Sequence, residues 1–534
     1  MTAPSEGSNA AASGGKLDAA ASGGKLDAAA SGGKLDAAAS GGKLDAAVLK
    51  IASVVVLGAI MSILDVTVVS VALPTFMQEF QASYATVAWT MTGYTLALAS
   101  VIPLTGWAAD RFGSKRLYLT ALVLFVAGSV LCSMAWDISS LIAFRVVQGL
   151  GGGMLMPLGM TIMTRAAGPH RVGRVMAVLG IPMLLGPIGG PILGGWLIES
   201  ASWHWIFLIN LPIGIVALIT AFVVLPKDQP SKSESFDFIG MLLLSPGLAL
   251  FLFGVSSIPE AGTIASARVL VNGLIGLALI TAFVFHALRA KNALVDLYLF
   301  RNRQLTFAVL TMSVFAIGFF GAGLLFPSYF LQVRGETTLS AGLLLAPQGL
   351  GAMLTMPIAG QLVDRIGPGK IVMVGLTLIT AGMAVFTQVG VDTSYGLLLG
   401  ALFVMGMGMG CTMMPTMTAA LQTLTDQSIA RGSTLMNIVQ QVAGSIGTAT
   451  MSVILTSQMV TPPGAPEGAA TPDADMVAQL PPEVQQSLLS SLADAFGTTF
   501  LVATCVMVLA LIPAAFLPRK RAELPAEGTP VVMH

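Results

Sequence analysis

Two ionisable residues, Asp65 and Arg145, lie well inside apolar stretches of a chain in which only 10% of the 534 residues are charged. A charged side chain at the centre of a membrane helix costs roughly 2.5–3.5 kcal/mol on insertion scales, so each residue needs a compensating role. A carboxylate beside a cation can bind and release a proton, because burial favours its neutral form and the cation favours its charged form. The pair therefore predicts a proton-coupling site. The alternative is a static ion pair that only holds helices together.

The depths of these two residues are compatible with a contact. At about 1.5 Å per helical residue, Asp65 lies roughly 14 Å from the outer end of the first apolar run, and Arg145 lies roughly 10 Å from the outer start of the fourth. Gln148 follows Arg145 after about one turn and is expected to line the same cavity or to make a helix–helix contact. No acid is found in the tenth run, so a second carboxylate is not evident there.

A second group of charged residues lies in two loops that repeat one pattern. The segments "GWAADRFGSKR" (106–116) and "GQLVDRIGPGK" (360–370) match at an offset of 254 residues. We expect the first Gly to let a neighbouring helix approach and the second to permit a tight turn. The Asp is expected to accept a hydrogen bond from a helix amino terminus or to form an ion pair with Arg. This predicts a gating clasp, with each Arg as the local partner of its Asp, formed by Gly106, Asp110, Arg111, Gly113, Gly360, Asp364, Arg365 and Gly367. The alternative is an ordinary basic loop with a turn.

The elements that position these residues are apolar runs of membrane-spanning length. Hydrophobic residues make up 55% of the chain and the mean hydropathy is +0.84. Roughly fourteen runs follow Ala47, the first beginning near residue 49 and the last near residue 495. A span of about 20 apolar residues crosses the hydrocarbon core as a helix, because lipid leaves no other way to satisfy the backbone. The sequence therefore predicts an all-α membrane protein.

The distribution of Lys and Arg tests this topology independently. With fourteen spans and a cytoplasmic amino terminus, the predicted inner loops and carboxyl tail hold eighteen Lys and Arg residues, whereas the outer loops hold two, Arg268 and Arg334. Basic residues favour the cytoplasmic side. Both termini are therefore expected to be cytoplasmic.

The predicted organisation follows from these spans and from shifts in composition. A disordered tail built on the nonapeptide SGGKLDAAA precedes two six-helix bundles that are separated by two extra transmembrane helices. Because the paired loops lie on the same side, the bundles are expected to be parallel repeats, as in alternating-access transporters. The expected boundaries are tail 1–47, bundle 48–225, cytoplasmic linker 226–237, extra helices 238–288, cytoplasmic linker 289–302, bundle 303–517 with a periplasmic loop at 458–492, and cytoplasmic tail 518–534.

Several motifs resemble the major facilitator superfamily, and in particular its fourteen-span drug:proton antiporters of the EmrB and QacA type. The paired loops are similar to the family's signature loop. The stretches "LDVTVVSVALP" (64–74), "RVVQGLGGG" (145–153) and "WHWIFLINLPIG" (203–214) resemble its other motifs, with Ser70 and His204 as departures. The antiporter motif is matched in "GPIGGPILGGWL" (186–197) at Gly186, Gly190, Pro191, Gly194 and Gly195. The resemblance implies the major facilitator fold and a seal against proton leak in the fifth span, where the alternative is an ordinary proline kink.

Other classes of function find little support in the sequence. "GGK" in the tail lacks the spacing of a phosphate loop, and the Gly-rich strings within apolar runs lack a preceding strand. No nucleophile–base or metal-ligand constellation stands out, so no enzyme activity, cofactor or metal is expected. The net charge of zero gives no reason to expect nucleic acid as a partner.

These observations together predict a proton-coupled multidrug exporter of the inner membrane that works by alternating-access antiport. Its expected partners are small amphipathic substrates, protons and the lipid bilayer, and a periplasmic adaptor protein is one candidate. The rival hypotheses are a dedicated exporter of one metabolite or siderophore, and a membrane sensor or structural subunit with the same fold that transports nothing.

Overall fold

The computed structural model describes residues 46–82, 84–167, 171–227, 236–258, 265–290, 293–425, 428–458 and 482–519. The chain divides into residues 1–45 and a second unit from Ala46 onward, which contains the described helices. The predicted repeat tail lies outside the described residues except for Ala46 and Ala47. Helices account for the regular structure of the described residues, which confirms the predicted fold class.

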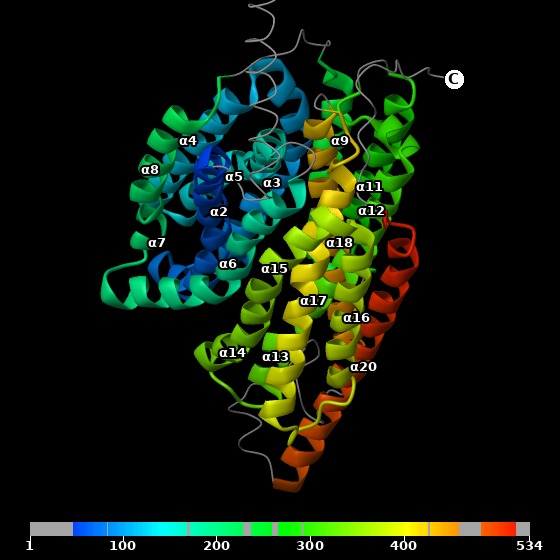
Figure 1. Cartoon of the computed structure of the whole chain (residues 1–534). Coiled ribbons are helices and arrows are strands. Elements are labelled where there is room, and N and C mark those ends of the chain that lie inside the picture. Colours follow the sequence, from blue (N-terminus) through cyan, green and yellow to red (C-terminus); the bar gives the residue numbers. More distant parts are fainter. Residues whose placement is uncertain are drawn as a thin grey trace, which may run out of the picture. The chain divides into compact units, whose positions relative to one another are not determined.

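The amino-terminal half packs its helices around α5. This helix contacts α3 and α4, while α2 lies against α6 and α8 (Figure 1). Helices α7 and α8 together form one apolar span. The helices of this half are α2 (Ala46–Glu79), α3 (Tyr84–Phe112), α4 (Ser114–Ser133), α5 (Ile138–Ala167), α6 (Val172–Ser200), α7 (Trp205–Leu208) and α8 (Asn210–Val224).

The carboxyl-terminal half repeats this arrangement with α17 against α15 and α16, and α12 against α18 and α20. Its last helix begins at Pro482, so residues 482–492, which were expected in a loop, are helical. Its helices are α12 (Arg303–Gly323), α13 (Leu325–Gln332), α14 (Thr338–Leu344), α15 (Ala346–Ile366), α16 (Pro368–Phe386), α17 (Tyr395–Leu421), α18 (Ile429–Gln458) and α20 (Pro482–Ala514).

An extra helix pair lies between the two halves in the sequence. Its members, α9 (Phe238–Ser256) and α11 (Ala267–Ala287), pack on each other, and the short helix η1 (Leu297–Arg301) follows them. Aromatic contacts hold α9 to α3 near both of its ends, with ring centroids 4.4 Å apart for Trp107–Phe236 and 5.2 Å apart for Trp89–Phe253. The pair is therefore attached to the amino-terminal half.

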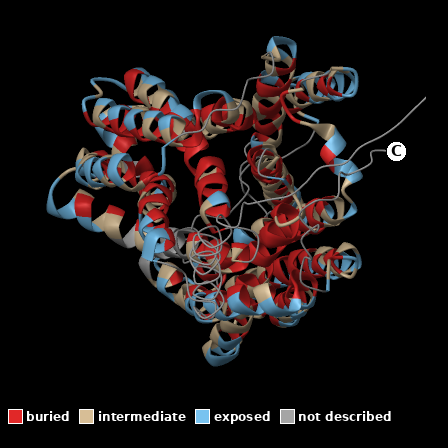
Figure 2. Cartoon of the chain, turned by 45° about the horizontal axis from the view of Figure 1, so that its top comes forward, coloured by how far each residue is buried: buried red, intermediate tan, exposed pale blue. Residues whose placement is uncertain are grey.

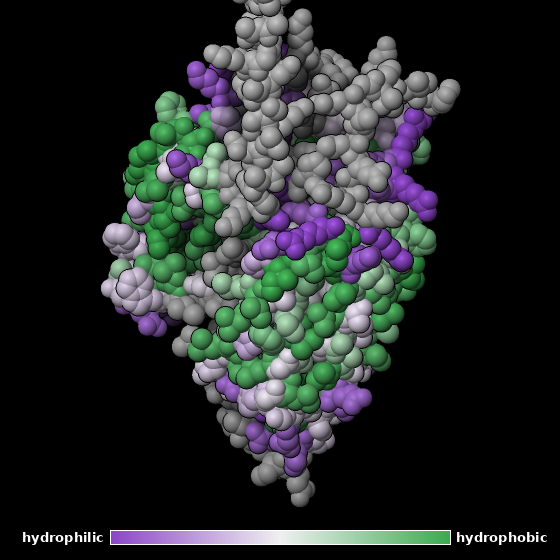
Figure 3. Space-filling model, in the orientation of Figure 1, coloured by the Kyte–Doolittle hydropathy of each residue, from purple (hydrophilic) through white to green (hydrophobic). Residues whose placement is uncertain are grey.

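The described residues include 13 helices that are long and apolar enough to cross a membrane. Helix α6 adds a further span, because its 29 residues contain no charge between Arg174 and Glu199. These helices support the predicted count of about fourteen. Hydrophobic side chains cover the flanks of both halves, and hydrophilic ones gather toward the ends (Figure 3). We call the end that carries the inner-loop Lys and Arg residues the basic end, which the positive-inside rule predicts to be cytoplasmic.

Buried residues lie mainly on the helix faces that turn toward neighbouring helices (Figure 2). Helices α4 and α5 pack closely where they cross. A Cβ atom added at Gly128 would lie 2.6 Å from the Cα of Gln148, and one at Gly151 would lie 2.5 Å from the backbone nitrogen of Phe125. Small residues allow helix backbones to meet in a membrane. The crossing therefore depends on both glycines.

Replacing Gly128 with Val is expected to push α5 away from α4, because overpacking of a close contact costs about 1–3 kcal/mol. The measurement is the thermal unfolding midpoint of the detergent-purified protein. Gly400→Val is the matched control, since a Cβ atom at Gly400 of α17 meets nothing within 4 Å. Equal midpoints for the two variants would contradict the packing argument.

Candidate functional site

Asp65 of α2 and Arg145 of α5 meet inside the amino-terminal half. Arg145 Nη1 donates to Asp65 Oδ2 at 2.5 Å, and the two side chains are 1% and 0% exposed. The expectation that the two residues lie at similar depth and meet is confirmed. A buried ion pair repays its desolvation only when further hydrogen bonds satisfy the remaining polar atoms. The surroundings of the pair supply such bonds.

Gln148 links the two charges to each other. Its Nε2 donates to Asp65 Oδ1 at 2.7 Å, and its Oε1 accepts from Arg145 Nη1 at 2.6 Å. Because Gln148 follows Arg145 by three residues on α5, both side chains leave the same face of the helix. The spacing of the sequence motif therefore places a cation and a neutral amide on one carboxylate.

Sequence reasoning missed two further members of this cluster, Asn210 and Ser129. Asn210 Nδ2, from the first residue of α8, donates to Asp65 Oδ1 at 3.3 Å and to Ser129 Oγ at 2.9 Å. Ser129 Oγ of α4 also accepts from Gln148 Nε2 at 3.0 Å. An amide in the apolar stretch "INLPIG" was the one available signal for Asn210, and Ser129 had none, since serine is common in membrane helices.

The other side of the Arg145 guanidinium is held by α3 and by Phe207. Arg145 Nε donates to the carbonyl oxygen of Thr90 at 3.1 Å, and its guanidinium lies 4.2 Å from the ring centroid of Tyr94. The Phe207 ring is 5.9 Å away. Aromatic faces attract a cation more strongly where water is excluded. Five helical segments, α2, α3, α4, α5 and the α7–α8 span, thus meet at one ion pair.

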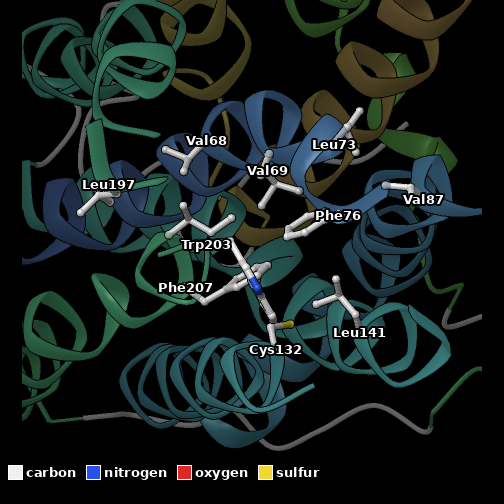
Figure 4. Packing of buried hydrophobic residues seen from close by; sticks show 12 residues of the cluster. Val68, Val69, Leu73, Phe76, Val87, Cys132, Leu141, Leu197, Trp203 and Phe207 are labelled. Atoms are coloured by element: carbon white, nitrogen blue, oxygen red, sulfur yellow. The ribbon is translucent and has the colours of Figure 1, made fainter. Parts of the chain in front are cut away.

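The structure differs from the sequence expectation in one respect, since the cluster does not line an open cavity. Asp65, Arg145 and Gln148 are all buried. Toward the outer ends of α2 and α5 lies an apolar cluster of buried residues (Figure 4), in which Phe76 packs edge-on against Trp203 with ring centroids 5.6 Å apart. Access to Asp65 from outside the protein therefore requires these helices to move.

The predicted antiporter motif seats α6 on α2 beside this cluster. A Cβ atom at Gly190 would lie 1.9 Å from Thr67 Oγ1, and one at Gly194 would lie 3.1 Å from Val68 Cγ1, within three residues of Asp65. Gly195 faces open space. Helix α6 runs unbroken through Gly186 and Pro191, whose side-chain surroundings lie outside the described part of the chain. Close α2–α6 contact is thus the observed role of two motif glycines.

A second site, the inner clasp, joins the halves at the basic end. Asp110 of α3 lies 3.3 Å from Arg165 Nη2 of α5 and 3.9 Å from Arg431 Nε of α18. In the paired loop, Asp364 of α15 lies 3.5 Å from Arg174 Nε of α6 and accepts from the Gly173 backbone nitrogen at 3.0 Å. Each Asp therefore reaches from its own half to the start of a helix in the other half.

The glycines of the paired loops behave as predicted. Gly113 and Gly367 adopt φ values of 93° and 86°, a region that favours glycine, and each separates two consecutive helices. A Cβ atom at Gly106 would lie 3.4 Å from the Arg431 Cα, and one at Gly360 would lie 2.8 Å from the Gly173 carbonyl oxygen. The close helix approach is thus an approach between the two halves.

The local pairing predicted for the two loop arginines is wrong. Arg111 and Arg365 are exposed, and the described ion pairs of Asp110 and Asp364 are with arginines of other helices. Consecutive residues of a helix point in different directions, so an Arg directly after an Asp does not face it. Sequence adjacency suggested a contact that helical geometry does not allow.

Lys115, the base that follows the first loop, closes another helix end. Its Nζ donates to the carbonyl oxygens of Phe222 at 2.6 Å and Leu225 at 2.7 Å. A cation at a helix carboxyl terminus satisfies free carbonyls and the helix dipole. This base therefore secures the last helix of the amino-terminal half. Among the described residues, no group of three or more His, Cys, Asp or Glu is placed to hold a metal ion.

The two halves share one helix arrangement and are joined at the basic end by matching ion pairs, and the amino-terminal half holds a buried ion pair. Parallel repeats of this kind are typical of membrane transporters. The family model of the Major Facilitator Superfamily matches residues 55–448. The chain belongs to this superfamily, as its motifs predicted.

Curated relatives and solved structures agree with this assignment. A multidrug resistance protein B homolog of Mycobacterium tuberculosis is 53% identical over 492 residues, covering 89% of this chain and 91% of the relative. The putative multidrug resistance protein MdtD of Escherichia coli is 33% identical, covering 75% and 85%. The proton:xylose symporter XylE shares the fold with a TM-score of 0.56 at 15% identity, covering 87% of this chain and 94% of that structure.

Replacing Asp364 with Asn is expected to weaken the inner clasp and to favour opening at the basic end. A partly buried ion pair contributes about 1 kcal/mol, so the closed-to-open ratio should fall about five-fold. The readout is the rate at which a thiol reagent alkylates the Ser433→Cys variant. Ser433 is buried against Thr161 of the other half. The variant is made in a protein from which Cys132, Cys411 and Cys505 have been removed.

Arg365→Gln is the matched control for this measurement, because Arg365 lies next to Asp364 but is exposed. Its alkylation rate should equal that of the parent. An unchanged rate in Asp364→Asn would contradict the clasp.

Proposed function

We propose that this protein exports amphipathic drugs from the cytoplasm across the inner membrane in exchange for protons. The observation that carries the proposal is the buried contact between Asp65 and Arg145, which places one acid and one base inside the membrane with neutral partners around them. Such a pair is costly to bury, and it changes its net charge when the acid takes up a proton.

Protonation would change what Asp65 contacts. In the described contacts both carboxylate oxygens accept hydrogen bonds from N–H groups of Arg145, Gln148 and Asn210. A protonated carboxyl carries one donor of its own and no charge, so it fits this arrangement poorly. Breaking a buried ion pair from one side costs about 3–5 kcal/mol. Protonation therefore supplies a driving force for the helices to rearrange.

Two helices connect the proton site with the inner clasp. Helix α5 carries Arg145 near its outer end and Arg165 at its basic end, about 30 Å apart along the axis. Helix α3 carries Thr90 and Asp110 in the same order. A displacement of either helix at the ion pair is therefore transmitted to the contacts between the halves. This linkage supports antiport by alternating access.

The substrate class rests on the relatives and on the surface between the halves. Relatives named as multidrug resistance proteins match this chain along most of its length. Helix α18, which contacts α3 and α5 of the other half, carries the partly exposed polar residues Asn437, Gln440 and Gln441 among apolar ones. A mixed surface of this kind suits amphipathic compounds of varied shape.

Asp65→Asn is expected to abolish drug-driven proton movement, because the amide cannot take up a proton in the accessible pH range. Inverted membrane vesicles with an internal acid gradient would receive ethidium and then a panel of neutral antimicrobials. Collapse of the gradient, followed with a pH-sensitive dye, reports antiport.

Asp392→Asn, which removes an exposed outer-loop carboxylate, is the control and should behave as the parent. Collapse in both variants would keep antiport and reject Asp65 as the proton carrier. No response of the parent to any compound would favour a dedicated exporter or a non-transporting sensor.

A further inference from the structure

The hydroxyl group of Ser129 occupies a central position in the proton cluster without touching either charge. Ser129 is 0% exposed, accepts from Gln148 Nε2 at 3.0 Å and from Asn210 Nδ2 at 2.9 Å, and donates to the carbonyl oxygen of Phe207 at 3.1 Å. A hydroxyl has one donor and two acceptor positions. All three positions are therefore occupied.

This occupancy fixes the orientation of both amides. Because the Ser129 proton is committed to the Phe207 carbonyl, the hydroxyl offers only lone pairs to Gln148 and Asn210. Each amide must then turn its NH₂ group toward Ser129, and the same NH₂ group reaches Asp65 Oδ1. In Gln148 the oxygen is left for Arg145. A reversed Gln148 amide would place its oxygen against the carboxylate and its NH₂ against the guanidinium.

We propose that Ser129 is a positioning residue that holds the amides of Gln148 and Asn210 as donors on the Oδ1 atom of Asp65, and that these donors tune the exchange of protons at Asp65. This inference rests on the proposed proton coupling and adds the elements that tune it. Hydrogen bonds donated to a carboxylate favour its ionised form. The serine on α4 therefore keeps both amide NH₂ groups, one of them from the asparagine on α8, on the carboxylate while the cluster is intact.

The remaining groups around Asp65 do not take over this role. Among the described residues, the charged and titratable groups that face the cluster from the helices packed on α2 are Arg145 of α5, Tyr94 of α3 and Cys132 of α4. Helix α6 has no charged or titratable residue between Arg174 and Glu199. Helix α8 contributes the neutral Asn210, and α7 contributes the Phe207 ring and carbonyl. Cys132 Sγ lies 3.7 Å from Gln148 Oε1, so it reaches the amide oxygen and not the carboxylate.

The test measures the pH dependence of ethidium-driven proton movement in proteoliposomes containing the full chain. Asn210→Ala removes a direct donor, so the midpoint of the pH profile should move to higher pH by about one unit, with Ser129→Ala moving it the same way by less. Ser133→Ala is the matched control, because Ser133 is a buried serine of the same helix that donates only to the Val130 carbonyl among the described contacts. Its midpoint should equal that of the parent.

The outcomes separate this inference from the proposed function. A parent protein that moves ethidium without protons overturns both. A coupled parent whose midpoint is unchanged in Ser129→Ala and Asn210→Ala overturns the positioning role alone. A lower rate at every pH with an unshifted midpoint also overturns it, because that is the effect expected of a purely structural role. Thermal unfolding of each variant identifies any that fails to fold.

Discussion

The buried contact between Asp65 and Arg145 is the constraint on which the amino-terminal half depends. Two opposite charges inside a membrane are tolerated only when geometry and further hydrogen bonds offset the loss of hydration. Here Gln148, Asn210 and the Thr90 carbonyl supply those bonds, and the Tyr94 ring faces the cation. Because the partners come from separate helices, satisfying the pair also fixes how those helices pack.

The inner clasp applies the same chemistry at the boundary between the halves. Asp110 and Asp364 are equivalent positions of the internal repeat, and each meets an arginine at the start of a helix in the opposite half. The glycines that precede them let the partner helices approach, as the contacts of Gly360 with α6 illustrate. The internal repeat therefore gives the inner clasp two matching sets of contacts, one at Asp110 and one at Asp364. Both sets must break if the halves are to separate at the basic end.

The sequence alone determined the helical fold, the internal repeat and the residues most costly to place in a membrane. Apolar run length predicted the spans, and the bias of Lys and Arg predicted their orientation, because both follow from local composition and the properties of the bilayer. The positions of Asp65 and Arg145 in those runs also predicted that they lie at similar depth, which makes a contact between them possible. The tight turns at Gly113 and Gly367 were predictable for the same local reason.

Only the tertiary structure decided which partners complete each site. Ser129 and Asn210 join Asp65 through the crossing of α4, α5 and α8, and no sequence spacing encodes that crossing. Adjacency pointed to Arg111 and Arg365 for the clasp, whereas helix geometry selected Arg431 and Arg174. The physical reason is that residue composition and hydrophobic periodicity are properties of a single helix. Hydrogen-bond partners on different helices depend instead on the distance and rotation between those helices, which the glycine contacts set.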